Sequence, residues 1–219
     1  MAETSGRPEP GRFITIEGPE GSGKTTQAER LVSDLRSQGL DVILTREPGG
    51  TWLGDRLREI LLARREASEA TDAITDALLF EAARRHLVQH VIKPALELGT
   101  WVVCARFADS TLAYQGYGAG IPLATLRELE WAATDGLQPD LTILLDLPPE
   151  TGLARKAPDD VTRFEADFDV GFHRRVRDGF LRLAANEPDR WVVVDASMDA
   201  EAVTAAIARA VSGRGRRRG

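Results

Sequence analysis

The sequence predicts an α/β fold in which helices cover both faces of a five-stranded parallel sheet, giving three layers. Five apolar segments of four or five residues, too short for buried helices, alternate with longer segments of helical periodicity. Parallel neighbouring strands need a crossover, and the intervening helices supply it. A glycine-rich turn follows the first apolar segment, at the strand end where open α/β sheets bind ligands. We therefore expect one domain with its site at that edge of the sheet.

Each predicted strand is a short run of β-favouring apolar residues bounded by turn or helix signals. These runs are residues 13–16, 42–45, 101–104, 141–145 and 191–195. The third run ends on Cys104, which we expect to be a buried strand residue. Because it is the only cysteine, no internal disulfide is expected.

Helices are expected where apolar residues recur every three or four positions. These segments are residues 25–38, 52–62, 72–97, 121–134, 151–156, 164–185 and 200–211. Gly39 ends the first helix, and we expect Pro94 to interrupt the long third one. The polar stretch between the fifth and sixth, about residues 156–163, is typical of a short lid.

Composition and charge place the chain among single-domain globular proteins. It has 219 residues, 42% hydrophobic and 28% charged, and its net charge of −6 argues against a nucleic-acid-binding surface over the whole molecule. The sequence has no apolar run of about 18 residues and no secretory signal, so we expect no membrane contact and a cytoplasmic location. The domain is expected to span residues 12–211, with disordered ends at residues 1–11 and at the basic residues 212–219.

A phosphate-binding loop is the strongest motif in the chain. Residues 18–25 fit G-x-x-x-x-G-K-[ST], between an apolar strand and an amphipathic helix. The glycines let successive backbone N–H groups surround a phosphate, and the helix that begins near Gly23 points its positive end at the same anion. Lys24 is expected to reach the β- and γ-phosphates, and the Thr25 hydroxyl to hold Mg²⁺. The residues expected to bind ATP are Gly18, Pro19, Glu20, Gly21, Ser22, Gly23, Lys24, Thr25 and Thr26.

Four motifs occur together in the chain, at residues 17–26, 45–51, 78–84 and 106–116. In this order they resemble the bacterial thymidylate kinases, and the likeness covers roughly residues 12–210. The resemblance implies a P-loop nucleoside monophosphate kinase fold and phosphoryl transfer from ATP to dTMP, giving dTDP and ADP in dTTP biosynthesis. It also implies Mg²⁺, a homodimer and a cation supplied by the lid.

The resemblance assigns roles to individual side chains. Glu20 is expected near the 3′-hydroxyl of dTMP, Phe80 to stack on thymine, Arg84 to bind its carbonyl edge and Tyr114 to crowd a 2′-hydroxyl. Phe80 and Arg84 are four apart, so they share one helical face. The residues implied to bind substrate are Glu20, Arg46, Glu47, Phe80, Arg84, Arg106, Thr111, Tyr114 and Gln115. Those implied to be catalytic are Lys24, Arg106, Arg155 and Arg163, with Lys156 as a further lid cation, and those near the metal are Thr25 and Glu47.

Two features depart from the family pattern: the lid has fewer arginines than the family usually carries, and the end of the third strand differs. The third strand of the family ends in Asp-Arg, whereas this chain has Ala105-Arg106. That aspartate normally lies beside the metal and the lysine of the phosphate loop. Two alternatives stay open: a kinase for another nucleoside monophosphate and, because of Ala105, a binding or regulatory protein that holds nucleotide but turns it over poorly.

Overall fold

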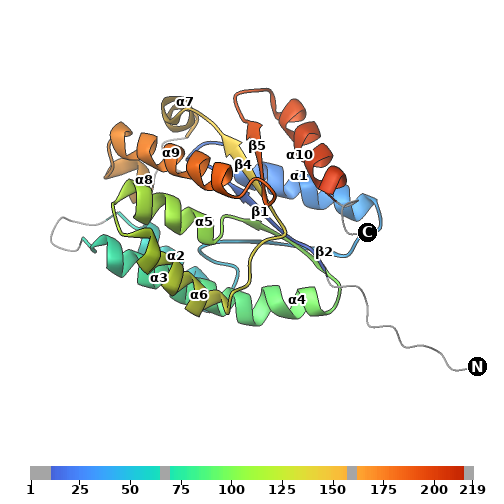
Figure 1. Ribbon diagram of the computed structural model, residues 1–219, viewed down its shortest axis with the longest axis horizontal. Helices are drawn as coiled ribbons and strands as arrows, with labels where there is room; N and C mark the ends of the chain where they lie inside the picture. Colours follow the sequence, from blue (N-terminus) through green and yellow to red (C-terminus); the bar gives the residue numbers. More distant parts are fainter. Residues whose placement is uncertain (1–10, 65–69, 157–161, 215–219) are drawn as a thin grey trace, which may run out of the picture.

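The computed structural model describes residues 11–64, 70–156 and 162–214, and a five-stranded parallel sheet forms its centre (Figure 1). The strands are β1 (Phe13–Glu17), β2 (Val42–Arg46), β3 (Trp101–Ala105), β4 (Leu141–Asp146) and β5 (Trp191–Asp195). They lie in the order β2-β3-β1-β4-β5 and every pair is parallel. Each strand begins and ends within one residue of its predicted range, so the predicted strands are confirmed.

The helices lie between the strands in the alternating order that the sequence predicts. They are α1 (Lys24–Ser37), α2 (Trp52–Leu62), α3 (Ala73–Leu87), α4 (Lys93–Glu97), α5 (Ala108–Thr111), α6 (Leu123–Thr134), α7 (Pro149–Ala154), α8 (Arg163–Ala166), α9 (Val170–Asn186) and α10 (Ala200–Arg214). Two π-helical segments, η2 (Val88–Ile92) and η3 (Leu112–Gly118), continue α3 and α5. Among the described helices, none is long and apolar enough to cross a membrane.

The two faces of the sheet have separate hydrophobic cores, as three layers require. Alternate strand residues such as Ile14 and Ile16 belong to one hydrophobic cluster with residues of α1 and α10, which lie side by side at the upper right of Figure 1. Their neighbours Phe13 and Cys104 point to the other face, beneath η2. Cys104 is fully buried in β3, as predicted.

Two helix predictions are wrong in detail. Pro94 does not interrupt the long third helix, because it lies in the first turn of α4 and the chain stays helical through the π turn of η2. The segment predicted as one helix over residues 164–185 is two helices. Asp169 starts α9, where its carboxylate accepts from Phe172 N–H (2.7 Å) and so favours a new helix start.

Two helices and the predicted lid differ from their expected boundaries or description. The helix predicted from residue 121 begins at Leu123, because Pro122 is its N-cap. The last helix continues to Arg214, beyond the predicted domain end at residue 211. Residues 157–161, most of the predicted lid, lie outside the described residues, as do residues 1–10 and 215–219 of the predicted disordered ends.

Candidate active site

The phosphate loop lies at the carboxyl edge of the sheet, between β1 and α1. Gly23 caps α1 in a left-handed conformation (φ 88°) that favours glycine. Gly21 is left-handed too (φ 68°), and a Cβ there would meet the carbonyl oxygen of Gly152 at 2.0 Å, so α7 packs directly on the loop. The loop residues therefore have the backbone geometry that their motif predicts.

Lys24 is buried against the loop and is not extended into solvent. Its ammonium donates to the carbonyl oxygens of Gly18 (3.0 Å) and Pro19 (2.6 Å). Burial lowers the pKa of Lys24 to about 7, and the positive charge of Arg106 acts in the same direction while Glu20 opposes it. The charge of this lysine therefore depends on its immediate carboxylate neighbours.

A strained turn follows β3 and directs the side chain of Arg106 toward the phosphate loop. Arg106 has φ 69°, a left-handed conformation that is uncommon for a residue with a side chain. The carboxylate of Glu17, at the end of β1, accepts from Phe107 N–H (2.7 Å) and from Ser110 Oγ (2.6 Å). Glu17 is fully buried, and burial together with Asp109 raises its pKa to about 7. Both bonds hold the chain that directly follows the strained residue.

Glu20 lies where three donors converge. Arg106 Nη2 donates to Glu20 Oε1 (2.6 Å), and the Tyr114 hydroxyl donates to the same oxygen (2.9 Å). Lys156 Nζ is 3.7 Å from the other carboxylate oxygen. Burial would raise the pKa of Glu20, but Arg106, Lys24 and Lys156 together hold it far below its usual range. Glu20 is therefore ionised, and it links the phosphate loop to β3 and to Lys156.

A second buried group surrounds Arg84 on α3. Arg84 Nε donates to Glu47 Oε2 (2.8 Å), and Arg84 Nη2 donates to Thr111 Oγ1 (3.1 Å). Glu81, one turn earlier on α3, pairs with Arg84 Nη1. Because Arg84 is 1% exposed, these partners fix the plane of its guanidinium group rigidly.

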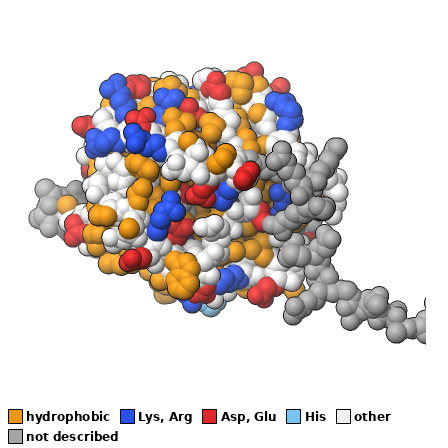
Figure 2. Space-filling view, viewed as in Figure 1, with side chains coloured by type: hydrophobic (Ala, Val, Ile, Leu, Met, Phe, Trp, Pro, Cys, Tyr) orange, Lys and Arg blue, Asp and Glu red, His pale blue; other side chains and the backbone are white. Residues whose placement is uncertain are grey.

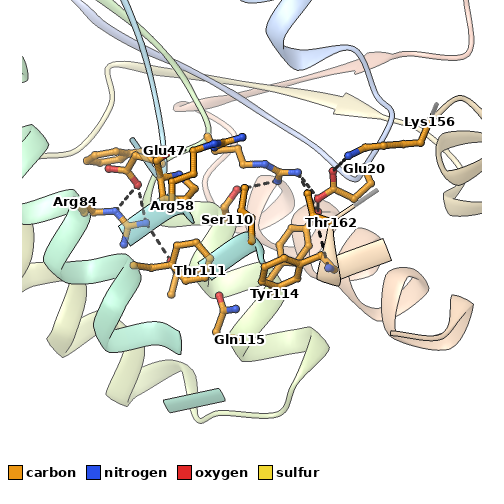
Figure 3. Close-up of a pocket in the computed structure, with 16 residues that line it drawn as sticks. Glu20, Glu47, Arg58, Arg84, Ser110, Thr111, Tyr114, Gln115, Lys156 and Thr162 are labelled. Atoms are coloured by element: carbon orange, nitrogen blue, oxygen red, sulfur yellow. Dashed lines mark hydrogen bonds and ion pairs between the residues drawn. The ribbon is translucent and has the colours of Figure 1, made fainter. Parts of the chain in front are cut away.

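These two groups lie on opposite sides of one pocket, which Figure 3 shows between Arg84 and Glu20. Its lining residues are Glu20, Glu47, Pro48, Arg58, Leu62, Phe80, Arg84, Arg106, Phe107, Ser110, Thr111, Tyr114, Gln115, Lys156, Thr162 and Phe164. Eight of the nine residues predicted to bind substrate are among them. The ninth, Arg46, is largely exposed and its guanidinium is 4.0 Å from Asp55. The pocket joins an aromatic and arginine-lined end to a cationic end beside the phosphate loop.

The two arginines predicted to act from the lid do not line this pocket. Arg155 donates to the carbonyl oxygen of Ala196 (3.1 Å). Arg163 is buried against α2 and α3, where it pairs with Asp76 (2.7 Å). Lys156 is the lid cation that reaches the pocket. The assignment of Arg155 and Arg163 to phosphate binding therefore stays a prediction that their positions here do not support.

The two residues predicted near Mg²⁺ differ in their fit to a metal. Thr25 is exposed in the first turn of α1, beside Lys24, as the phosphate-loop motif requires. Glu47 is buried and Arg84 binds its Oε2, whereas its Oε1 is buried without a hydrogen-bond partner and is the oxygen left for a metal. In the part of the chain that the structure describes, no three His, Cys, Asp or Glu side chains form a group able to hold a metal. This is compatible with the usual kinase site, where Mg²⁺ keeps waters and binds substrate phosphates.

The chain matches the family profile described as thymidylate kinase over residues 16–207. The chain belongs to the thymidylate kinase family. Its relatives include the thymidylate kinase of Deinococcus radiodurans, 50% identical over 94% of this chain and 98% of that protein. That of Thermomicrobium roseum is 52% identical over 89% of this chain and 91% of the relative. The crystal structure of thymidylate kinase from Ehrlichia chaffeensis is similar to this structure with a TM-score of 0.73 and 35% sequence identity. The match covers 93% of this chain and 99% of the chain in that crystal structure.

These comparisons confirm the resemblance to thymidylate kinases and the three-layer P-loop fold that it implies. Sequence reasoning did not single out several residues that line the pocket. These are Pro48, Arg58, Leu62, Phe107, Ser110, Thr162 and Phe164. Phe107 and Ser110 lie inside the motif at residues 106–116, so that motif held a signal for them. Arg58 and Leu62 share one face of α2, but the sequence does not indicate that α2 borders the pocket.

Proposed function

We propose that this member of the thymidylate kinase family transfers the γ-phosphoryl group of ATP to dTMP, giving dTDP and ADP. The observation that carries the proposal is the pocket itself. It places Phe80 and Arg84 at one end and Arg106 at the other, next to the phosphate loop. An aromatic ring and a fixed guanidinium suit a pyrimidine base, and Arg106 suits the phosphate of a nucleoside monophosphate.

The proposed reaction needs positioning and charge neutralisation more than a base. An oxygen of the dTMP phosphate attacks the γ-phosphorus of ATP, and ADP leaves on the opposite side. We propose that Lys24 and the loop amides hold the donor phosphates and that Arg106 holds the acceptor phosphate. Lys156, which lies 3.7 Å from Glu20, is the described lid residue best placed to approach the transferring group. Arg155 and Arg163 would have to leave their present partners to do so.

We further propose that Mg²⁺ accompanies ATP, with the Thr25 hydroxyl as a ligand from the protein. When bound beside Thr25, the ion would supply positive charge that neutralises the donor phosphates. Glu47, the other residue implied near the metal, would be a second ligand through Oε1, because Arg84 binds only its Oε2. Glu20 remains ionised beside the loop, where it is available to a hydroxyl of the acceptor sugar.

The test is a coupled assay of ADP release with ATP, Mg²⁺ and a panel of acceptors. With dTMP, dUMP, dCMP and AMP measured side by side, we expect the highest kcat/KM for dTMP. A higher kcat/KM for another monophosphate would identify that nucleotide, and not dTMP, as the preferred acceptor. ATP binding without turnover on any acceptor would indicate the impaired nucleotide-binding form that Ala105 leaves open.

Tyr114 is expected to exclude ribonucleotides from this pocket. Its ring is 5% exposed and packs edge-on against Phe164 (5.7 Å between centroids), so it cannot move aside for an added hydroxyl. We expect Tyr114→Ala to reduce the preference for dTMP over the ribose analogue by about tenfold, within the usual 1–3 kcal/mol of overpacking. Tyr114→Phe is the control, because it keeps the ring and loses only the hydroxyl that bonds Glu20. The preference is the ratio of kcat/KM for dTMP to kcat/KM for the ribose analogue. If Tyr114→Ala leaves this ratio unchanged, Tyr114 has only a packing role.

We propose a cytoplasmic homodimer, as the resemblance implies. Support comes from Ile74 and Leu78 on α3 and Trp131 on α6, which are 43%, 50% and 69% exposed on two helices in contact. Figure 2 shows hydrophobic side chains among the charged ones over the lower part of this face. Such an apolar group is typical of a subunit interface.

We expect sedimentation equilibrium to give twice the 23.9 kDa chain mass, and Trp131→Arg to shift the protein toward the monomer. Leu98→Arg is the control, because Leu98 is 74% exposed but follows α4 and lies on neither α3 nor α6. A parent protein that sediments as a monomer would overturn the homodimer. Equal dissociation by both variants would show that α3 and α6 do not form the interface.

A further inference from the structure

Arg163 lies where the ends of two helices meet. Its Nε donates to the carbonyl oxygen of Leu61 (2.5 Å), in the last turn of α2. Its Nη2 is 2.7 Å from Oδ2 of Asp76, in the first turn of α3. The last carbonyl groups of a helix lack partners within the helix and carry partial negative charge, so they attract a cation. Arg163 is therefore held by one helix end and one carboxylate, both well suited to a guanidinium group.

This contact is buried and is unlike a surface ion pair. Arg163 is 6% exposed and Asp76 is 4% exposed. The other oxygen of Asp76 accepts from Thr71 Oγ1 (2.6 Å), which fixes the carboxylate from its far side. A buried ion pair whose guanidinium also binds a carbonyl group and whose carboxylate has a second donor holds one geometry, whereas an exposed pair samples many. The segment that begins at Arg163 is thereby joined to α2 and α3.

The next residue, Phe164, forms part of the pocket wall. Its ring centroid is 6.2 Å from that of Phe80 and 5.7 Å from that of Tyr114. On its other side Phe168 stacks on it (5.8 Å). Phe80 and Tyr114 are the residues proposed to contact the thymine base and the deoxyribose. The position of Phe164 therefore sets the width of the acceptor pocket between them.

We propose that Arg163 is a positioning residue for the acceptor nucleoside: its contacts with Asp76 and the Leu61 carbonyl fix Phe164 as a wall of the dTMP pocket. This inference rests on the proposed function, and it differs from a phosphate-binding role for Arg163. A cation that binds the transferring phosphate acts mainly on kcat. A residue that shapes the acceptor pocket acts on the KM for dTMP and leaves the KM for ATP unchanged.

The experiment compares two conservative variants that break the same contact from its two ends. Arg163→Lys keeps the charge but loses the Nε–H that bonds Leu61, and Asp76→Asn keeps the shape but loses the charge. Each is expected to raise the KM and the calorimetric Kd for dTMP roughly tenfold, since small misplacements in a site have large effects. The double variant should bind dTMP no more weakly than the more impaired of the two single variants, because both substitutions remove the same contact. Phe164→Leu should reproduce the dTMP effect with the ion pair intact.

Arg56→Lys is the matched control, because Arg56 pairs with Glu59 on the exposed side of α2, away from the pocket. It should behave as the parent in every measurement. The inference is overturned if Arg163→Lys lowers kcat at unchanged KM for dTMP while Asp76→Asn matches the parent, since that pattern identifies a phosphate cation. It is also overturned if the two single effects multiply in the double variant. If the parent protein itself neither binds nor phosphorylates dTMP, the proposed function fails and this inference fails with it.

Discussion

Replacing Lys24 with alanine is expected to lower kcat by about 10²–10³ while the protein stays folded. The ammonium group contributes charge where negative charge develops on the transferring phosphate, and no other described lysine lies in the phosphate loop. The fold should survive because the bonds that Lys24 makes are to carbonyl oxygens of its own loop, not to another element. The measurement is steady-state turnover of ATP and dTMP, with thermal unfolding measured on the same samples.

The structure makes one refinement necessary. Lys24 is 8% exposed, so its removal also empties buried space around the stem. Lys24→Met fills that space without the charge and should lose as much activity as Lys24→Ala. Lys93→Ala, at an ion pair on α4, is the control for loss of a lysine elsewhere and should retain full turnover. Activity of Lys24→Met within threefold of the parent would contradict the role assigned to the phosphate loop.

The sequence predicted the strands and the phosphate loop because both are encoded locally. A strand is a short apolar run, and the loop motif specifies glycines at the positions where the backbone turns. The pairing of Phe80 with Arg84 was predictable for the same reason, since it depends only on helical spacing. Most of the residues predicted to bind substrate are found in one pocket because whole motifs, not isolated residues, carried the prediction.

The sequence did not indicate contacts between residues far apart in the chain. Glu17 ends an apolar strand, and its partner Phe107 N–H lies 90 residues later. Arg163 was assigned to phosphate chemistry because it follows the predicted lid, but its partner Asp76 lies in the first turn of another helix. The π-helical segments were missed because their geometry depends on packing and has no periodic signal of its own. Tertiary contacts decide these features, and a single sequence does not list them.

Placing aspartate at residue 105 is expected to raise kcat by roughly 10- to 150-fold, equivalent to about 1.5–3 kcal/mol for a hydrogen bond to a charged group. Ala105 ends β3 and belongs to the core cluster on the face that α1 covers. A carboxylate there would lie near the positive N-terminal end of α1, the helix that begins with Lys24. It can orient the ammonium group and accept from a water on Mg²⁺, whereas a methyl group can do neither.

The neighbouring carboxylates already have partners of their own. Glu17 holds the turn at Phe107 and Ser110. Glu47 is bound to Arg84 through Oε2, and its Oε1 has no hydrogen-bond partner. The carboxylate of Asp109 is bound on both oxygens by Arg190, at 2.7 and 2.9 Å. A new aspartate at residue 105 should therefore add a function that the site lacks.

The pH dependence of Ala105→Asp distinguishes an effect on the charge of Lys24 from a rise in rate that is the same at every pH. With the pKa of Lys24 lowered to about 7, its charged form predominates below pH 7 and is lost as the pH rises through that value. In the parent protein, kcat/KM for ATP is expected to fall on this alkaline side, since that ratio reports groups of the free enzyme. A carboxylate at residue 105 favours the charged lysine, so Ala105→Asp should move the alkaline limb to higher pH.

Ala105→Asn is the control for these measurements, because it has nearly the same shape as the aspartate and no charge. It should neither raise kcat nor shift the limb, and the dTMP affinity should be similar in all three proteins, since Phe80 and Arg84 are unchanged. A gain shared by Ala105→Asn would assign the effect to packing at the end of β3. If kcat of Ala105→Asp is equal to or below that of the parent at saturating Mg²⁺, residue 105 is not where a catalytic carboxylate is missing, and the low pKa of Lys24 is compatible with full activity.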